Sequence, residues 1–215
     1  MEIQIPQRLK RSNPLRQIKN CCRILTMQIS YFGNTGFLLK GNDASVALAL
    51  PAEKIGNAEI VVTATENEEM QASAEQSVFD WPGEYEARGV SVQLIPVGNE
   101  KPSRIAKIII DGISIVHLDG VTEPLTDTEE EQIGGVDMLL VSVGKAAALG
   151  EKQIKNTIEA LEPKIVVPMN FAAGEEIEFA KTLGFGEVEG EDSLKLKAES
   201  LPSERMELKI LRPRK

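Results

Sequence analysis

His117 is the residue with the widest chemical range in this chain, and it is the only histidine among 215 residues. An imidazole can act as a general base near neutral pH, or it can activate a serine for nucleophilic attack. Ser114 and Ser142 are the conceivable partners, but neither stands in a Gly-x-Ser-x-Gly turn. The chain also lacks a glycine-rich phosphate loop followed by Lys-Ser/Thr. We therefore expect no hydrolytic triad and interpret His117 as a structural histidine, with a catalytic base as the alternative.

Short strands joined by tight turns are predicted to position His117. It stands near the end of the apolar run Ile113–Leu118, where alternation places it on the same face as Ile113 and Ile115. Asp111-Gly112 before this run is a strong signal for a two-residue hairpin. Similar turns are predicted at 41–43 and 88–89, so the first half of the chain is expected to be an antiparallel meander.

The second half shows strands alternating with helices. We predict helices over 127–132, 151–161 and 175–183, each with acidic residues in its first turn. The apolar runs 138–141 and 165–167 between them are typical of strands buried on both faces. Two alternating strands, 194–197 and 206–211, close the chain around the polar turn 201–204.

Composition favours one large acidic α/β domain. Hydrophobic residues make up 42% of the chain and aromatic residues only 4%, so aliphatic side chains must fill the core. The first 26 residues hold six basic residues and one acid, a net charge of +5, and the remainder has a net charge of −14. Such an acidic surface repels nucleic acid, so nucleic-acid binding is expected only through the N-terminal tail.

The tail is treated as separate from the domain. We predict residues 1–26 to be a basic extension, disordered or a start-site artefact, and residues 27–215 to be the folded domain. Both cysteines, Cys21 and Cys22, lie in the tail, so no spaced pair is available for a disulfide framework. No apolar run approaches the roughly 18–20 residues of a membrane span, and we expect a cytoplasmic protein.

The order of several segments resembles the metallo-β-lactamase superfamily, in particular its small lactonase-like hydrolases. The segments are Met27–Phe32 with Gly33–Phe37, Ala58–Thr63, Trp81–Glu86, Ile108–Gly120, Val136–Gly144 and Pro163–Phe171. The resemblance covers nearly everything from Met27 onward. It implies an α/β fold, the four-layer αβ/βα sandwich of the metallo-β-lactamase type, with its site along the strand edges.

The resemblance also implies positions for metal ligands, and this chain departs from the family at each one. The corresponding residues here are Asn34, Ala64, Glu66, Glu68, Glu69, Gly120 with Asp119 one residue earlier, and Asn170. Zinc prefers imidazole nitrogen or thiolate sulfur and needs three protein ligands to activate its water. No histidine remains at these positions, so we expect no metal cofactor and least of all zinc.

The resulting hypothesis is a non-catalytic member of the fold, a pseudoenzyme with a degenerate metal site and a binding or scaffold role. Its partner would be an unidentified small ligand or protein. One alternative is a hydrolase of a small phosphorylated or lactone substrate, with magnesium or manganese held by Glu66, Glu68, Glu69 and Asp119. Another is a nucleic-acid-associated protein that uses the basic tail.

Three further residues are expected near the pocket. Trp81 and Tyr85 flank the Pro-Gly-Glu turn that matches the family's Pro-Gly-Glu-Tyr-Glu segment, and in such relatives this segment lies near the pocket rim. They could stack on a ligand there or simply pack as a corner. Lys145, after the strand that ends at Val143-Gly144, is the basic residue we expect to meet an anionic ligand.

Overall fold

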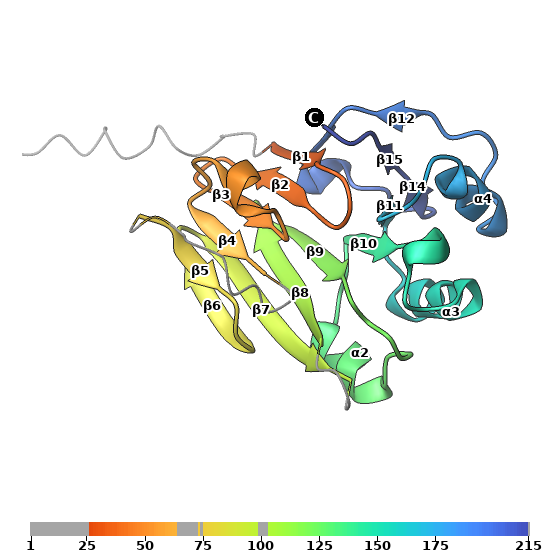
Figure 1. Cartoon of the computed structure of the whole chain (residues 1–215), viewed down its shortest axis with the longest axis horizontal. Helices are drawn as coiled ribbons and strands as arrows, with labels where there is room; N and C mark the ends of the chain where they lie inside the picture. The colour runs from red at the N-terminus through yellow and green to blue at the C-terminus, as the bar shows by residue number, and fades with distance from the viewer. Residues whose placement is uncertain (1–25, 64–72, 74, 99–102, 215) are drawn as a thin grey trace, which may run out of the picture.

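Two large sheets form the centre of the molecule (Figure 1). The computed structural model describes residues 26–63, 73, 75–98 and 103–214. The first sheet has six strands in the order β13-β1-β2-β3-β4-β5. Their bounds are β1 Met27–Tyr31, β2 Phe37–Lys40, β3 Ser45–Leu48, β4 Ile60–Val62, β5 Ser77–Phe79 and β13 Leu194–Leu196.

The second sheet has seven strands in the order β14-β11-β10-β9-β8-β7-β6. Their bounds are β6 Gly83–Ala87, β7 Val90–Val97, β8 Ser103–Ile110, β9 Ile113–Leu118, β10 Met138–Ser142, β11 Ile165–Met169 and β14 Glu207–Leu208. Strands β9, β10 and β11 run parallel, so their carboxyl ends meet at one edge of the sheet. That edge is where polar loop residues converge.

The helices are short, and most of them cover the second sheet (Figure 1). The α-helices within the described residues are α1 Ala52–Ile55, α2 Asp127–Ile133, α3 Glu151–Leu161 and α4 Glu175–Thr182. The described residues also form the 3₁₀ turns η3 Gly144–Ala146 and η4 Ala198–Ser200 and a small parallel pair, β12 Gly190–Glu191 with β15 Ile210–Leu211. None of the helices in the described ranges is long and apolar enough to cross a membrane.

The main core lies between the two sheets. Alternate residues of each strand point inward, and this alternation places Phe37 and Leu39 of β2 opposite Ile108 of β8 and Leu140 of β10 in one buried cluster. Burial of one such side chain contributes about 1.5–3 kcal/mol. Because this layer is continuous across both sheets, it holds them together.

A second buried cluster lies between the outer face of the second sheet and the helices. Helix α3 contributes Ile154, Ile158 and Leu161, which recur at helical spacing and pack with Val141 of β10 and Phe179 of α4. On the far side of the first sheet, α1 covers a smaller apolar group. The layers are therefore helix, sheet, sheet and helix, and the predicted four-layer sandwich is confirmed.

The predicted turns and strands mostly agree with the structure. Asp111-Gly112 and Arg88-Gly89 both adopt positive φ and join antiparallel strands, as two-residue hairpin turns require. The predicted helices appear as α2, α3 and α4, and Thr126 caps α2 with a reciprocal hydrogen bond to Glu129.

The antiparallel meander predicted for the first half was wrong in one place. Strand β4 runs parallel to both β3 and β5, with Ala47 beside Val61 and Val61 beside Val78. For β3 and β4, the reason is the crossover through α1, which carries the chain across the outer face of the sheet before β4 begins. Its four residues were too few to show a helical period in the sequence.

Candidate functional site

A small cavity of about 80 Å³ lies beyond the carboxyl ends of β9, β10 and β11. We call it the strand-end pocket. Its polar lining comes from Asp119 after β9, Ser142 at the end of β10 and Asn170 after β11. Its apolar side is formed by segment 146–149 and by Ile154 of α3. The parallel strands therefore bring together residues that are about 50 positions apart in the sequence.

Two positions that the resemblance gives to metal ligands, Asn34 and Asn170, are joined through one tyrosine. The Tyr31 hydroxyl donates to the carbonyl oxygen of Asn34 at 2.8 Å and accepts from the backbone N–H of Asn170 at 2.9 Å. Both asparagines have positive φ, 49° and 57°, a conformation that asparagine adopts more readily than most residues. We call this arrangement the Tyr31 bridge.

Packing holds the Tyr31 bridge in place. The Tyr31 ring stacks on Phe37 at a centroid distance of 4.9 Å and tilts against Phe171 at 6.0 Å. Tyr31 is only 2% exposed, and this burial raises the pKa of its hydroxyl, although the hydrogen bond from Asn170 partly opposes the shift. The phenol therefore stays protonated at neutral pH and keeps its donor for Asn34.

Gly120 occupies another position that the resemblance gives to a ligand, and its backbone is unsuited to a side chain. Its φ is 66°, and a Cβ placed there would lie 3.2 Å from the Ser103 hydroxyl oxygen. That hydroxyl donates to the Gly120 carbonyl at 2.6 Å. Asp119, one residue earlier, is the acidic residue that lines the strand-end pocket.

The remaining ligand positions lie outside the described residues. They are Ala64, Glu66, Glu68 and Glu69. Among the residues that the structure does describe, no group of three or more His, Cys, Asp or Glu side chains is arranged to hold a metal ion. A single carboxylate beside a serine and an asparagine does not fit zinc, which prefers nitrogen and sulfur donors. The described part of the pocket is therefore a poor zinc site.

His117 is fully buried on the inner face of β9. Its Nε2 lies 2.9 Å from the carbonyl oxygen of Thr35, which can only accept, so Nε2 carries the proton. The ring meets Phe37 edge-on at 6.2 Å, and Nδ1 has no hydrogen-bond partner among the described residues. Burial lowers the pKa of His117 more than Asp119 and the Thr35 hydrogen bond raise it. These contacts favour a neutral, structural imidazole.

Neither candidate serine pairs with His117. The Ser114 side chain lies on the opposite face of β9 from His117, and its hydroxyl donates to the Gly135 carbonyl at 2.9 Å. Ser142 lies on the same inner face as His117, since Leu140 is beside His117 in the sheet. Its Oγ and the His117 Nδ1 are both buried without partners in the described structure, so they are not bonded to each other. His117 therefore forms no nucleophile–base pair with either serine.

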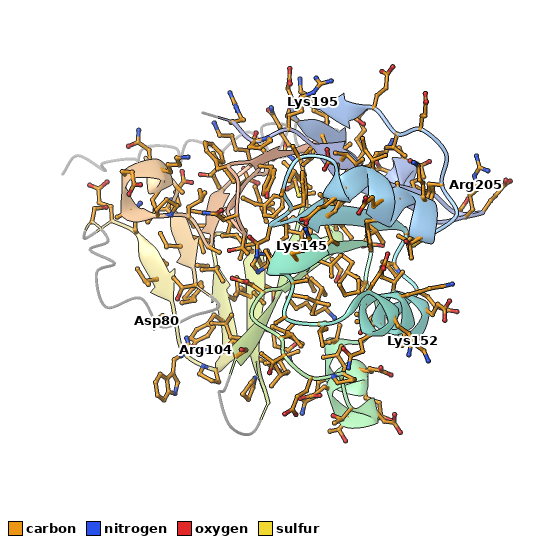
Figure 2. The ribbon with its side chains drawn as sticks, turned by 45° about the vertical axis from the view of Figure 1, so that its right-hand side comes forward. Asp80, Arg104, Lys145, Lys152, Lys195 and Arg205 are labelled. Carbon is orange, nitrogen blue, oxygen red and sulfur yellow. The ribbon has the colours of Figure 1, made fainter. Side chains whose placement is uncertain are left out.

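Trp81, Tyr85 and Lys145 do not line the strand-end pocket. Trp81 is 67% exposed, and the Arg104 guanidinium lies 5.8 Å from its ring centroid. Arg104 also donates to the backbone carbonyl of Asp80, and the two residues lie side by side in Figure 2. Tyr85 stacks on Phe79 and donates its hydroxyl to the Trp81 carbonyl. The segment therefore forms a corner.

Lys145 (Figure 2) lines a neighbouring cleft of about 180 Å³ between η3 and α4. The Glu175 carboxylate accepts from the backbone N–H of Lys145 and from that of Ala172. These two hydrogen bonds, with the Lys145 charge as a smaller cause, lower the pKa of Glu175. Glu151 and Glu178 also line the cleft, so it presents acidic residues as well as Lys145.

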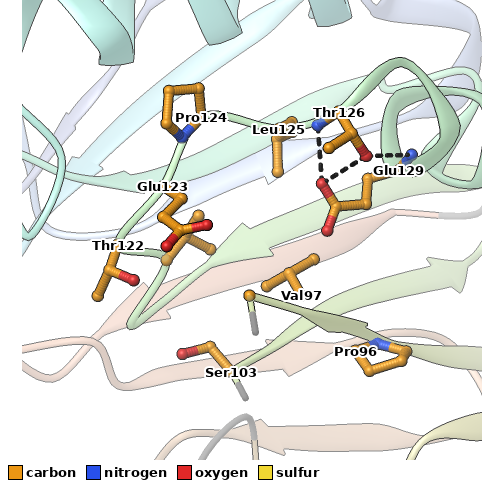
Figure 3. A pocket seen from close by; sticks show the side chains of 11 residues that line it. Pro96, Val97, Ser103, Thr122, Glu123, Pro124, Leu125, Thr126 and Glu129 are labelled. Atoms are coloured by element: carbon orange, nitrogen blue, oxygen red, sulfur yellow. Dashed lines mark hydrogen bonds between the residues drawn. The ribbon is translucent and has the colours of Figure 1, made fainter. Parts of the chain in front are cut away.

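A larger pocket of about 410 Å³ opens at the same edge of the sandwich (Figure 3). It lies between the ends of β7 and β8 and the segment that leads from Gly120 to α2. Glu123 and Thr122 border it, whereas the Glu129 carboxylate is engaged in capping α2 through Thr126. Sequence reasoning missed this pocket, because its walls come from segments about 25 residues apart.

Comparison with known proteins agrees with this architecture. The sequence matches the beta-lactamase superfamily domain over residues 28–170, about two thirds of the chain. The chain therefore belongs to the metallo-β-lactamase superfamily. A search of curated proteins gave no significant match.

Solved structures show the same fold. A protein from Thermotoga maritima, assigned as a Zn-dependent hydrolase of this superfamily, is 27% identical with a TM-score of 0.72 and covers 86% of this chain and 100% of that one. Igni18, a metallo hydrolase from Ignicoccus hospitalis, is 17% identical with a TM-score of 0.59 over 80% and 99%. YhfI from Bacillus subtilis, a metallo-β-lactamase fold protein, is 10% identical with a TM-score of 0.59 over 88% and 97%.

Proposed function

We propose that this chain is a non-catalytic member of the superfamily, with a binding or scaffold role in place of metal-dependent hydrolysis. The observation that carries this proposal is the Tyr31 bridge. Its hydroxyl ties together the backbones of Asn34 and Asn170, two positions to which the resemblance assigns histidine ligands. A phenol and two asparagines stabilise the fold at this edge but are weak donors for zinc.

The chemistry of the described pocket supports the same conclusion. A catalytic zinc needs three protein ligands and an open position for water, which it activates by lowering the water pKa to about 7. In the described part of the chain the strand-end pocket has one carboxylate, Asp119, and Gly120 cannot accept a side chain without strain. The fully buried His117 is engaged with Thr35 and packed against Phe37, which suits a structural role.

A metal-dependent hydrolase is the second candidate. It is favoured by the structural neighbours, which are mostly metal-dependent hydrolases, and by the position of Asp119 at the pocket. Its metal would be a hard cation, magnesium or manganese, bound by Asp119 together with Glu66, Glu68 and Glu69. The substrate would be a small phosphorylated or lactone compound.

Metal analysis of the purified full-length protein separates these two functions. We expect well under one zinc, manganese or magnesium ion per chain, and no change in melting temperature when a chelator is added. A metal present at about 100 times its Kd would stabilise the folded state by about 2.7 kcal/mol, which a thermal melt detects readily. Tightly bound metal at one or more equivalents would contradict the non-catalytic proposal.

Asp119→Asn provides the matched variant for this test. If the protein is non-catalytic, the variant and the native chain should have the same metal content. Both should also lack activity on chromogenic lactone and phosphodiester probes. Under the hydrolase alternative, the native chain hydrolyses a probe, and Asp119→Asn loses both metal and turnover because the carboxylate is a ligand.

Two further proposals concern organisation and location. We propose that residues 27–215 form the functional domain and that residues 1–26 are a basic extension. We also propose a cytoplasmic protein, on the basis that residues 27–215 contain no cysteine. RNA binding that falls steeply with added salt would instead support the nucleic-acid alternative for the tail.

A further inference from the structure

The edges of the two large sheets differ in charge. Among the described strands, β13 carries Lys195 at its centre, and Glu207 of β14 is paired with Lys209 at 3.2 Å. Strand β5 has no charged residue. Strand β6 instead exposes two acids, Glu84 and Glu86, on one face. It is the acidic edge of the sandwich.

The other face of β6 is apolar and incompletely covered. Tyr85 and Ala87 are half-buried against the main core, and Tyr85 stacks on Phe79 of β5 at 4.5 Å. Strand β6 pairs only with β7 in the described structure, so its outer backbone groups face away from the sheet. The edge can therefore form main-chain hydrogen bonds with an added strand. Its side chains alternate as acidic, apolar and acidic at Glu84, Tyr85 and Glu86.

A second copy of β6 is a poor partner for this edge. Antiparallel self-pairing about Tyr85 would place Glu84 of one copy opposite Glu86 of the other, and like charges directly opposite each other are destabilising. The complementary strand should have a basic residue, an apolar residue and a basic residue in succession. Its apolar side chain would cover Tyr85, and its cations would face the two acids.

The N-terminal segment of this chain has that pattern. Ile3, Ile5 and Leu9 occupy odd positions, whereas polar residues, including Arg8 and Lys10, occupy most even positions. This alternation is typical of a half-buried strand. Pro6 is compatible with an edge strand, because it lacks only the N–H that an outer strand directs to solvent.

We propose that residues 7–11 add an antiparallel strand to the β6 edge of the same molecule. Leu9 lies opposite Tyr85 in this register, Arg8 lies opposite Glu86, and Lys10 lies opposite Glu84. This pairing leaves Pro6 just outside the new strand.

Chain length and charge both permit this intramolecular pairing. The 15 residues from Arg11 to Leu25 can span up to about 50 Å when extended. A domain of this size is about 40 Å across. The net charges of +5 for the tail and −14 for the remainder favour the contact over a wide surface.

Hydrogen exchange of the full-length protein at low salt tests the proposal. We expect the alternate backbone amides of residues 7–11 that face β6 to be protected. The double substitution Arg8→Glu with Lys10→Glu should reduce this protection by roughly three- to tenfold, the effect of losing two exposed ion pairs. Glu84→Lys with Glu86→Lys should reduce it equally, and combining all four changes should restore it.

Arg16→Glu with Lys19→Glu is the matched control, since it makes the same change in charge outside the proposed strand. It should leave protection of residues 7–11 intact, and amides of β8 should stay protected in every variant if the domain is folded. The proposal is overturned if residues 7–11 exchange at the rate of an unstructured peptide in the native chain. It is also overturned if the four changes together fail to restore protection, or if protection requires a dimer by light scattering.

Discussion

The core between the two sheets and the edge at the carboxyl ends of the strands differ in the kind of side chain that they bury. The core is a continuous aliphatic layer in which side chains such as Leu39, Ile108 and Leu140 are fully buried. The edge contains buried polar atoms that have no partner in the described structure: Thr63 Oγ1, His117 Nδ1 and Ser142 Oγ. These atoms lie at or near the carboxyl ends of β4, β9 and β10.

The difference shows that the scaffold and the site depend on separate residues. Packing between the sheets needs only apolar volume on alternate positions, whereas a metal site needs specific donors at a few loop positions. Loss of the donors therefore leaves the fold intact. Four substitutions or titrations test this separation.

Phe37→Ala should have the largest effect, because it removes a fully buried ring from the core that also supports Tyr31 and His117. We expect the free energy of unfolding to fall by about 3–5 kcal/mol. Denaturant unfolding followed by circular dichroism measures this change. A loss below about 1 kcal/mol would show that the core does not depend on this ring.

Tyr31→Phe should have the next largest effect. The change removes the hydroxyl that donates to Asn34 and accepts from Asn170, and it leaves both backbone groups without that partner. We expect a loss of about 1–3 kcal/mol in unfolding free energy. Tyr85→Phe is the matched control, since its hydroxyl also bonds a carbonyl but is exposed, and it should cost clearly less. Equal costs would contradict a structural role for the Tyr31 bridge.

The pH dependence of stability tests the buried imidazole. Burial holds the pKa of His117 below its ordinary value of 6.5, so between these two values the unfolded chain binds a proton that the folded protein does not. The free energy of unfolding is therefore not reduced by His117 above about pH 6.5, and it falls as the pH drops towards the lower pKa of the folded state. The slope should reach at most about 1.4 kcal/mol per pH unit. His117→Leu should flatten this part of the profile, and an unchanged slope would refute the assignment.

Ser142→Ala should have the smallest effect. The Ser142 hydroxyl is buried without a partner in the described structure, so its removal costs no hydrogen bond. We expect a change within about 1 kcal/mol of zero, in the stabilising direction, because an unsatisfied polar group is removed. Thermal unfolding at neutral pH measures it. A large destabilisation would indicate that Ser142 has a partner at the strand-end pocket that this structure does not contain.

Much of the fold was predictable because its signals are local. The Asp111-Gly112 and Arg88-Gly89 turns depend on residues that accept positive φ, and the helix cap at Thr126 depends on its own side chain. The parallel β3-β4-β5 arrangement was not predictable in this way. Its β3-β4 part results from the short α1 crossover, whose four residues show no periodicity.

The site was only partly predictable. The resemblance indicated that Asp119, Gly120 and Asn170 lie near one another, and the parallel strands do bring them to one pocket. Nothing in the sequence near Tyr31 indicated the contact with Asn170, which lies 139 residues away. Trp81 and Lys145 were placed near the pocket by their neighbours in sequence; neither lines the strand-end pocket, and Lys145 lines the neighbouring cleft.

The amino-acid sequence by itself determined the layers, the turns and the absence of histidine from the ligand positions, because these follow from residue type and short-range spacing. Tertiary structure alone decided that the Tyr31 hydroxyl bridges Asn34 and Asn170. It also decided that Ser103 lies beside Gly120 and that the buried His117 ring packs against Phe37. Those contacts join strands of different sheets or distant loops. The contacts of Tyr31 with Asn170 and of His117 with Phe37 exist only once burial of the apolar layer has brought the two sheets together.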